Sequence, residues 1–77
     1  MRVQVHLTGS LRAILEDRPE SVMVDVPGPS TVGELLRAAG IPPRVVVVAL
    51  VDGVGRDEEY RVEGDAELTL FGPLAGG

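Results

Sequence analysis

The sequence predicts an α+β domain in which a sheet of four or five strands carries its helices on one face. Short stretches in which apolar and polar residues alternate, the pattern of half-buried strands, recur along the 77 residues. One longer segment has the spacing and the end signals of a helix. Because one main helix can cover only one face of such a sheet, we expect the opposite face to be open to water or to a partner.

The first third of the chain predicts a strand, a short helix and a second strand. Residues 3–7 alternate between apolar and polar side chains, as a strand with one buried face does. Ser10 is expected to cap the short helix, in which the apolar residues between 11 and 15 share one face by i, i+3, i+4 spacing. Residues 22–26 alternate again until Pro-Gly-Pro at 27–29 ends the strand. We expect these two strands to pair antiparallel.

The main helix is predicted at residues 32–39. Thr31 and Glu34 have the spacing of a capping box, in which each side chain binds the other residue's backbone N–H. The apolar residues that follow recur at helical spacing. Gly40 suits the residue just after the helix, and the prolines at 42–43 prevent its continuation.

The second half of the chain predicts two further strands. Residues 45–51 form an unbroken apolar run rich in valine, which predicts a strand in the middle of the sheet, and Asp-Gly at 52–53 is typical of a hairpin turn. Residues 56–60 predict a polar loop, with or without one short edge strand. After a turn at 63–65, residues 66–71 alternate as the last strand.

The composition excludes several classes of function. The formal net charge is −5 and the seven arginines are scattered, which argues against binding of nucleic acid. Cysteine is absent, so the chain has neither a disulfide nor a thiol nucleophile of its own. The longest apolar run, residues 45–51, is far too short to span a membrane. We therefore expect a cytoplasmic protein that binds no membrane.

No self-contained active site is apparent in the sequence, so the chain is not expected to be an enzyme by itself. His6 lies on the polar side of the first strand without a second histidine, and exposure to solvent is favoured over a role as base or metal ligand. The carboxylates at 57–59 lack the spacing of a calcium loop. The glycines at 53 and 55 are too far from a helix start to bind phosphate. No metal site is predicted.

The C-terminal segment is the remaining candidate. We expect a folded domain at residues 1–72 and a mobile tail at 73–77, because Gly76 and Gly77 have no side chain to pack. A frayed chain end would have the same composition. Leu68 and Leu70 are expected to face the core, which sends Phe71 to the opposite side of the sheet as a candidate interface anchor, unless a loop covers it.

Three segments of the chain, residues 7–12, 31–36 and 70–77, resemble the ubiquitin-like β-grasp sulfur carriers. This family includes the small subunit of molybdopterin synthase and the sulfur carrier of thiamine biosynthesis. The short helix after the first strand and the ending Pro-Leu-Ala-Gly-Gly are more similar to the molybdopterin branch. The resemblance implies a β-grasp fold with a mixed sheet.

The resemblance also implies a function for the tail. A ubiquitin-activating-type adenylyltransferase would use ATP to adenylate the carboxylate of Gly77, and a sulfur donor protein would convert it to a thiocarboxylate. Gly76, Ala75, Leu74 and Pro73 would form the segment that enters the active site of a partner. In the molybdopterin branch this partner is the large synthase subunit, with which the carrier forms a heterotetramer. No tightly bound cofactor is implied, because the ATP belongs to the activating enzyme.

Two other functions stay open at this point. A carrier of the same fold could serve another pathway, such as thiamine, cysteine or tRNA thiolation. A β-grasp interaction module could end in Gly-Gly without any sulfur chemistry.

Overall fold

The computed structural model describes residues 1–73. In chain order the elements are β1 (Arg2–Thr8), α1 (Ser10–Ile14), β2 (Ser21–Asp25), β3 (Ser30–Thr31), α2 (Val32–Ala38), the 3₁₀ turn η1 (Pro43–Val45), β4 (Val48–Val51), β5 (Val54–Arg56), β6 (Arg61–Val62) and β7 (Ala66–Phe71).

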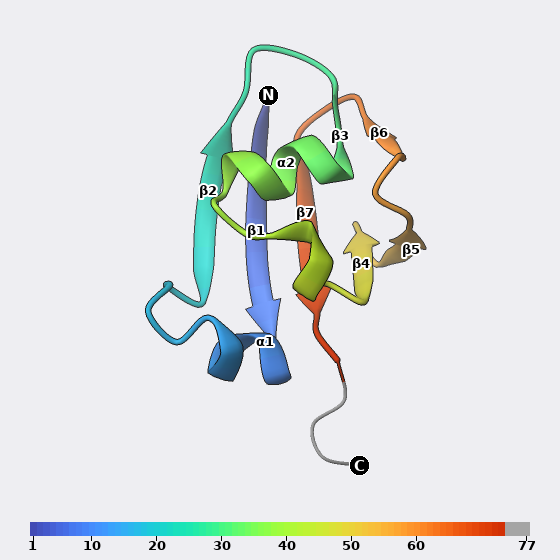
Figure 1. Ribbon diagram of the computed structural model, residues 1–77. Coiled ribbons are helices and arrows are strands. Elements are labelled where there is room, and N and C mark those ends of the chain that lie inside the picture. Colours follow the sequence, from blue (N-terminus) through green and yellow to red (C-terminus); the bar gives the residue numbers. More distant parts are fainter. Residues whose placement is uncertain (74–77) are drawn as a thin grey trace.

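The main sheet has five strands in the order β2-β1-β7-β4-β5, and β3 pairs with β6 in a separate ribbon. β1 and β7 run parallel, whereas the other neighbours in the main sheet are antiparallel, so the sheet is mixed. α2 lies across one face of this sheet, and α1 lies at the end where β1 and β7 stop (Figure 1). The predicted α+β class and the antiparallel pairing of β1 with β2 are confirmed.

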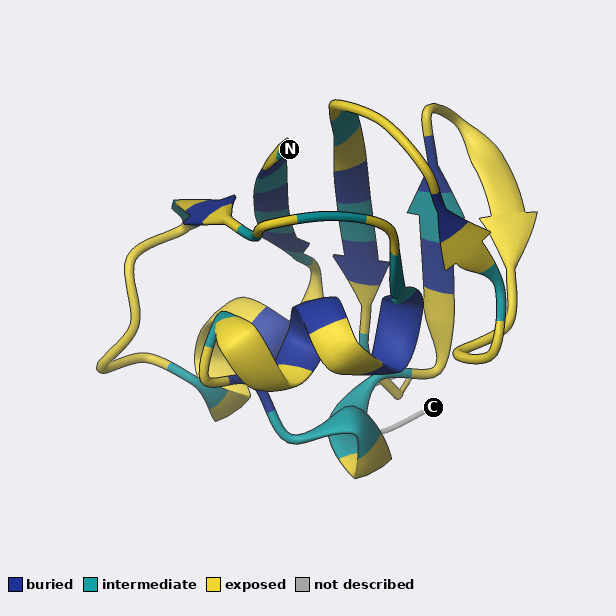
Figure 2. Ribbon diagram, turned by 90° about the horizontal axis from the view of Figure 1, so that it is seen from above, coloured by how far each residue is buried: buried dark blue, intermediate teal, exposed yellow. Residues whose placement is uncertain are grey.

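The core lies between α2 and the inner face of the sheet. The buried face of α2 points toward the strands, as Figure 2 shows from above. Leu35 and Leu36 of α2 meet Leu68 and Leu70 of β7 in one cluster, and Leu11 of α1 completes it at one end. This burial is the main source of stability in a domain of this size.

α2 forms as its end signals predict. The Thr31 side chain accepts the N–H of Glu34 at 3.1 Å, and the Glu34 carboxylate accepts the N–H of Thr31 at 2.8 Å. Gly40 follows the helix with a φ of 77°, in the left-handed region that favours glycine. Local chemistry therefore determines both ends of this helix.

The prediction for residues 45–51 is wrong in two respects. Val45 belongs to η1, and β4 begins only at Val48. Because Pro43 starts a tight turn, the N–H groups of Val45 and Val46 donate to the carbonyls of Pro42 and Pro43 instead of a sheet neighbour. β4 is also not the middle strand, since β7 occupies the centre and β4 lies between β7 and β5.

The β4–β5 hairpin turns at Asp52 and Gly53, whose φ angles of 48° and 84° are both positive, as its Asp-Gly sequence predicts. The polar loop between β5 and β6 covers residues 57–60, because Arg56, which was expected in the loop, is the last residue of β5. The helices of residues 1–73 include none with the length and apolarity to cross a membrane.

Candidate functional site

Phe71, at the end of β7, points to the face of the sheet opposite α2. Its neighbour Leu70 is buried in the core, whereas the Phe71 side chain is 38% exposed. The outward direction predicted from the alternation of β7 is therefore found. Whether Phe71 contacts a partner stays a prediction.

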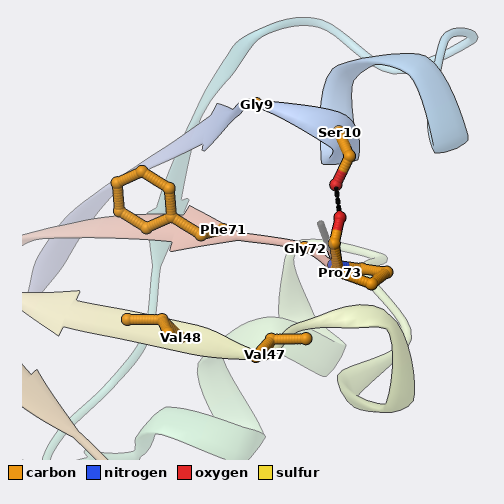
Figure 3. Close-up of a pocket in the computed structure, with 7 residues that line it drawn as sticks. All are labelled: Gly9, Ser10, Val47, Val48, Phe71, Gly72 and Pro73. Carbon is orange, nitrogen blue, oxygen red and sulfur yellow. Dashed lines mark hydrogen bonds between the residues drawn. The ribbon is translucent and has the colours of Figure 1, made fainter. Parts of the chain in front are cut away.

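An apolar hollow of about 520 Å³ lies beside Phe71. Its walls come from the start of α1, the start of β4 and the end of β7: Gly9, Ser10, Val47, Val48, Phe71, Gly72 and Pro73 (Figure 3). Val47 is 64% exposed and Val48 is 42% exposed. An exposed aromatic beside exposed aliphatics is typical of a protein–protein contact surface.

Val47 belongs to the predicted strand at residues 45–51 and is not a predicted site residue. The structure leaves it between η1 and β4, where its N–H donates to the carbonyl of Phe71 at 2.8 Å. The pair of prolines just before the valines is the signal that could have indicated a delayed strand.

The beginning of the predicted tail is held against α1. The hydroxyl of Ser10 donates to the carbonyl oxygen of Pro73, which Figure 3 marks with a dashed line. The prediction of Ser10 as a helix cap is wrong, because Gly9 occupies the N-cap position and no side chain caps this helix. The other predicted tail residues, Leu74, Ala75, Gly76 and Gly77, lie outside the described residues.

The remaining candidates form no reactive cluster. His6 is on the outer face, partly exposed, with its Nε2 3.3 Å from a carboxylate oxygen of Glu67. Among residues 1–73 no group of three or more side chains could hold a metal ion, and no polar or charged residue is buried. A catalytic site normally contains buried or clustered titratable groups. Among residues 1–73 every titratable side chain is at least partly exposed.

The negative charge of the protein is concentrated in one segment. Residues 52–67 contain seven carboxylates and two arginines, which gives five net negative charges. The rest of the chain has five carboxylates and five arginines, so the whole formal charge of −5 lies in this segment. It includes β5, at one edge of the sheet, and the loop to β6. A field of this sign favours the approach of a positively charged partner.

Two solved structures similar to this fold come from Haloferax volcanii. The crystal structure of SAMP1 from Haloferax volcanii matches over 100% of both chains, with 27% sequence identity and a TM-score of 0.78. A crystal structure of H. volcanii small archaeal modifier protein 1 matches with 24% identity and a TM-score of 0.70, over 95% of this chain and 98% of that one. No protein-family model matches the sequence, and neither does any curated protein. The structural likeness confirms the β-grasp, ubiquitin-like fold that the sequence predicts.

Proposed function

We propose that this chain, a small protein with the ubiquitin-like β-grasp fold of the sulfur-carrier type, carries sulfur as a thiocarboxylate on Gly77. The observation that carries the proposal is the position of the apolar hollow. The exposed side chains of Val47, Val48 and Phe71 lie at the end of the sheet where the chain leaves β7 toward Gly77. A partner that binds this surface therefore also meets the C-terminal segment.

The chemistry follows from what the chain lacks. Without cysteine the chain has no thiol to supply the sulfur, so we expect activation and sulfur both to come from partner proteins. An adenylyltransferase of the ubiquitin-activating type would use ATP to adenylate the carboxylate of Gly77. A second protein with a persulfide would supply sulfur.

A carboxylate oxygen of Gly77 attacks the α-phosphorus of ATP, and pyrophosphate leaves. The persulfide of the donor protein attacks the resulting acyl adenylate, AMP leaves, and an acyl disulfide joins the donor to Gly77. A thiol then attacks the donor-side sulfur, which leaves the thiocarboxylate on Gly77 and the donor in a disulfide with that thiol.

The surface and the tail have separate tasks in binding. Residues 73–77 span about 17 Å when extended, enough to enter the active site of another protein. Ordering five residues costs about 5–10 kcal/mol. Burial of three partly exposed side chains contributes on the order of 1 kcal/mol each, so the partner must also bind the main chain of the tail.

For the acceptor we propose the large subunit of molybdopterin synthase, with which this chain would form a heterotetramer. The support is the resemblance of the short helix and the Pro-Leu-Ala-Gly-Gly ending to that branch. Carriers for thiamine, cysteine or tRNA thiolation have the same activation chemistry. In each of these alternatives we expect the specificity for the acceptor to lie in the partner protein.

Conjugation to other proteins is a second candidate function, supported by the similarity of this fold to a small archaeal modifier protein. The same adenylate would then react with an amine on a target protein. This chain has no lysine, so that side-chain amine would belong to a different protein.

Intact-mass analysis tests the proposal. The chain is incubated with ATP, a cognate activating enzyme and a persulfide donor, and a variant that lacks Gly77 is the control. Exchange of one oxygen for sulfur at Gly77 supports the carrier, and an amide link to another protein supports the modifier. An unchanged mass with enzymes proven active on another carrier would contradict both. Addition of the synthase large subunit and the pterin precursor then tests the acceptor, since a dithiolene should form.

A further inference from the structure

The start of α1 and the start of the tail are in direct contact, although 63 positions of sequence separate Ser10 from Pro73. β1 and β7 are parallel neighbours, and Thr8 is paired with Phe71 at their common end. Both strands therefore end at the same end of the sheet, where β1 continues into α1 and β7 continues into the tail. The Thr8 hydroxyl donates to the carbonyl of Leu70 at 2.8 Å and ties the two strand ends together.

Gly9 directs α1 toward the tail. Its φ of 58° and ψ of −135° belong to a region that only glycine adopts without strain. This single residue turns the chain from β1 into α1. As a result Ser10 faces the carbonyl of Pro73, as Figure 3 shows.

Gly72 lies so close to α1 that no side chain fits there. A Cβ atom on Gly72 would be 2.9 Å from Cγ of Leu11 and 2.9 Å from Oγ of Ser10. Leu11 is buried in the core and cannot move aside cheaply. Glycine at position 72 is thus a requirement of close packing, not only a source of freedom.

We propose that Ser10, Leu11 and Gly72 form a tail clamp, which fixes the point and the direction in which the C-terminal segment leaves the domain. Ser10 is then a positioning residue that holds Pro73. The segment beyond the clamp, residues 74–77, has a length of about 14 Å when fully extended, in place of about 17 Å for residues 73–77. For the sulfur chemistry this inference rests on the proposed function, whereas the clamp itself does not.

Nuclear magnetic resonance tests the clamp without any partner. In the parent chain the amides of Gly72 and Leu74 should have heteronuclear ¹H–¹⁵N Overhauser values near those of the sheet, and higher than that of Gly76. Ser10→Ala should lower both values and shift the Pro73 carbonyl ¹³C signal. Ser10→Thr, which keeps the hydroxyl, should restore them. Ser30→Ala is the matched control, because the Ser30 hydroxyl also donates to a backbone carbonyl, that of Gly28, far from the tail.

A second arm measures function. With the activating enzyme, Ser10→Ala should raise the KM for the carrier about two- to tenfold, the range for one lost hydrogen bond, at unchanged kcat. Ser10→Thr should return KM to the parent value, and Gly72→Ala should act like Ser10→Ala.

The outcomes are distinct. Unchanged Overhauser values at Gly72 and Leu74 in Ser10→Ala overturn the clamp. Lowered values with an unchanged KM overturn its positioning role. If the parent chain is never thiocarboxylated, the sulfur-carrier proposal fails, while the resonance data still decide whether the clamp exists.

Discussion

Val48 lies directly opposite Phe71 in the antiparallel ladder between β4 and β7, and both side chains point away from α2. Cross-strand neighbours on one face of a sheet are in contact range. The pair therefore forms one apolar surface that adjoins the start of the tail. The outer face of the sheet therefore has an apolar region at Val48 and Phe71. Farther from this end the same face has a polar region with His6 and Glu67.

Substitution of this pair should weaken partner binding and leave the fold intact. We expect Val48→Asp and Phe71→Ala each to lower the affinity for the activating enzyme about tenfold or more, because each removes a central apolar contact. Calorimetric titration measures the affinity. Met23→Ala is the matched control, since Met23 is 50% exposed on the same face but on the edge strand β2. An equal loss in Met23→Ala would show that the hollow has no special role.

The structure could be predicted from the sequence wherever interactions between residues close in the chain determine it. The capping box of Thr31 and Glu34 and the alternation around Phe71 act within a few residues, so α2 and the outward aromatic could be predicted. An apolar run does not itself indicate the residue at which a strand begins. Val46 and Val47 have the composition of a strand, but the turn at Pro43 delays β4.

The clamp could not be predicted from the sequence for a different reason. It requires β1 and β7 to be parallel neighbours, a relationship that local patterns do not specify. Without that pairing, Ser10 is expected to be a helix cap and Pro73 to be the first residue of a mobile tail. The structure assigns both residues to one contact.

Substitution of Thr31 should lower stability more than substitution of Ser10, because only Thr31 caps a helix. Thr31→Ala removes a true N-cap and should lower the free energy of unfolding by about 1 kcal/mol. For a domain of this size the melting temperature then falls by about 4–8 °C. Ser10→Ala should cost less than half as much, because Ser10 caps no helix. Thermal melting followed by circular dichroism compares the two, and equal losses would contradict the assignment.

Stability should depend on pH through Glu34. Its pKa lies below the ordinary value, first because the carboxylate accepts the backbone N–H of Thr31, then through the Thr31 side chain and the nearby charges of Arg61 and Arg37. With the folded pKa below the unfolded one, the contribution is complete above the unfolded pKa of about 4.3. It is lost as the pH falls through the folded pKa.

Urea unfolding between about pH 7 and pH 3 measures this dependence. Glu34→Gln should reduce stability at neutral pH and differ less from the parent in acid. Glu63→Gln, in the exposed turn between β6 and β7, is the control. A Glu34→Gln variant whose difference from the parent is the same at every pH would contradict the prediction.

Leu11 should be the residue that fixes α1 to the domain. It is fully buried, so Leu11→Ala should lower the free energy of unfolding by about 2–5 kcal/mol. Ile14 in the same helix is 46% exposed, and Ile14→Ala should cost clearly less. Chemical denaturation of the two variants gives the comparison. Similar losses would mean that α1 does not pack as described, and the clamp would lose its rigid support.

Deletion of Gly77 should separate stability from transfer. The core cluster of the described residues extends from Val3 to Leu70, so removal of the last residue should leave the melting temperature within about 2 °C, the effect of a few tenths of a kcal/mol or less. Thiocarboxylation should fall sharply, because the carboxylate then belongs to Gly76 and lies one residue, about 3.5 Å, short of the activating enzyme's reaction centre. A misplacement of this size exceeds the 1 Å that can already cost a hundredfold in rate. Addition of one glycine after Gly77 is the matched control for length in the other direction. If both variants accept sulfur as fast as the parent, the partner does not read the position of the carboxylate, and a clamp that fixes the reach of the tail would serve no purpose.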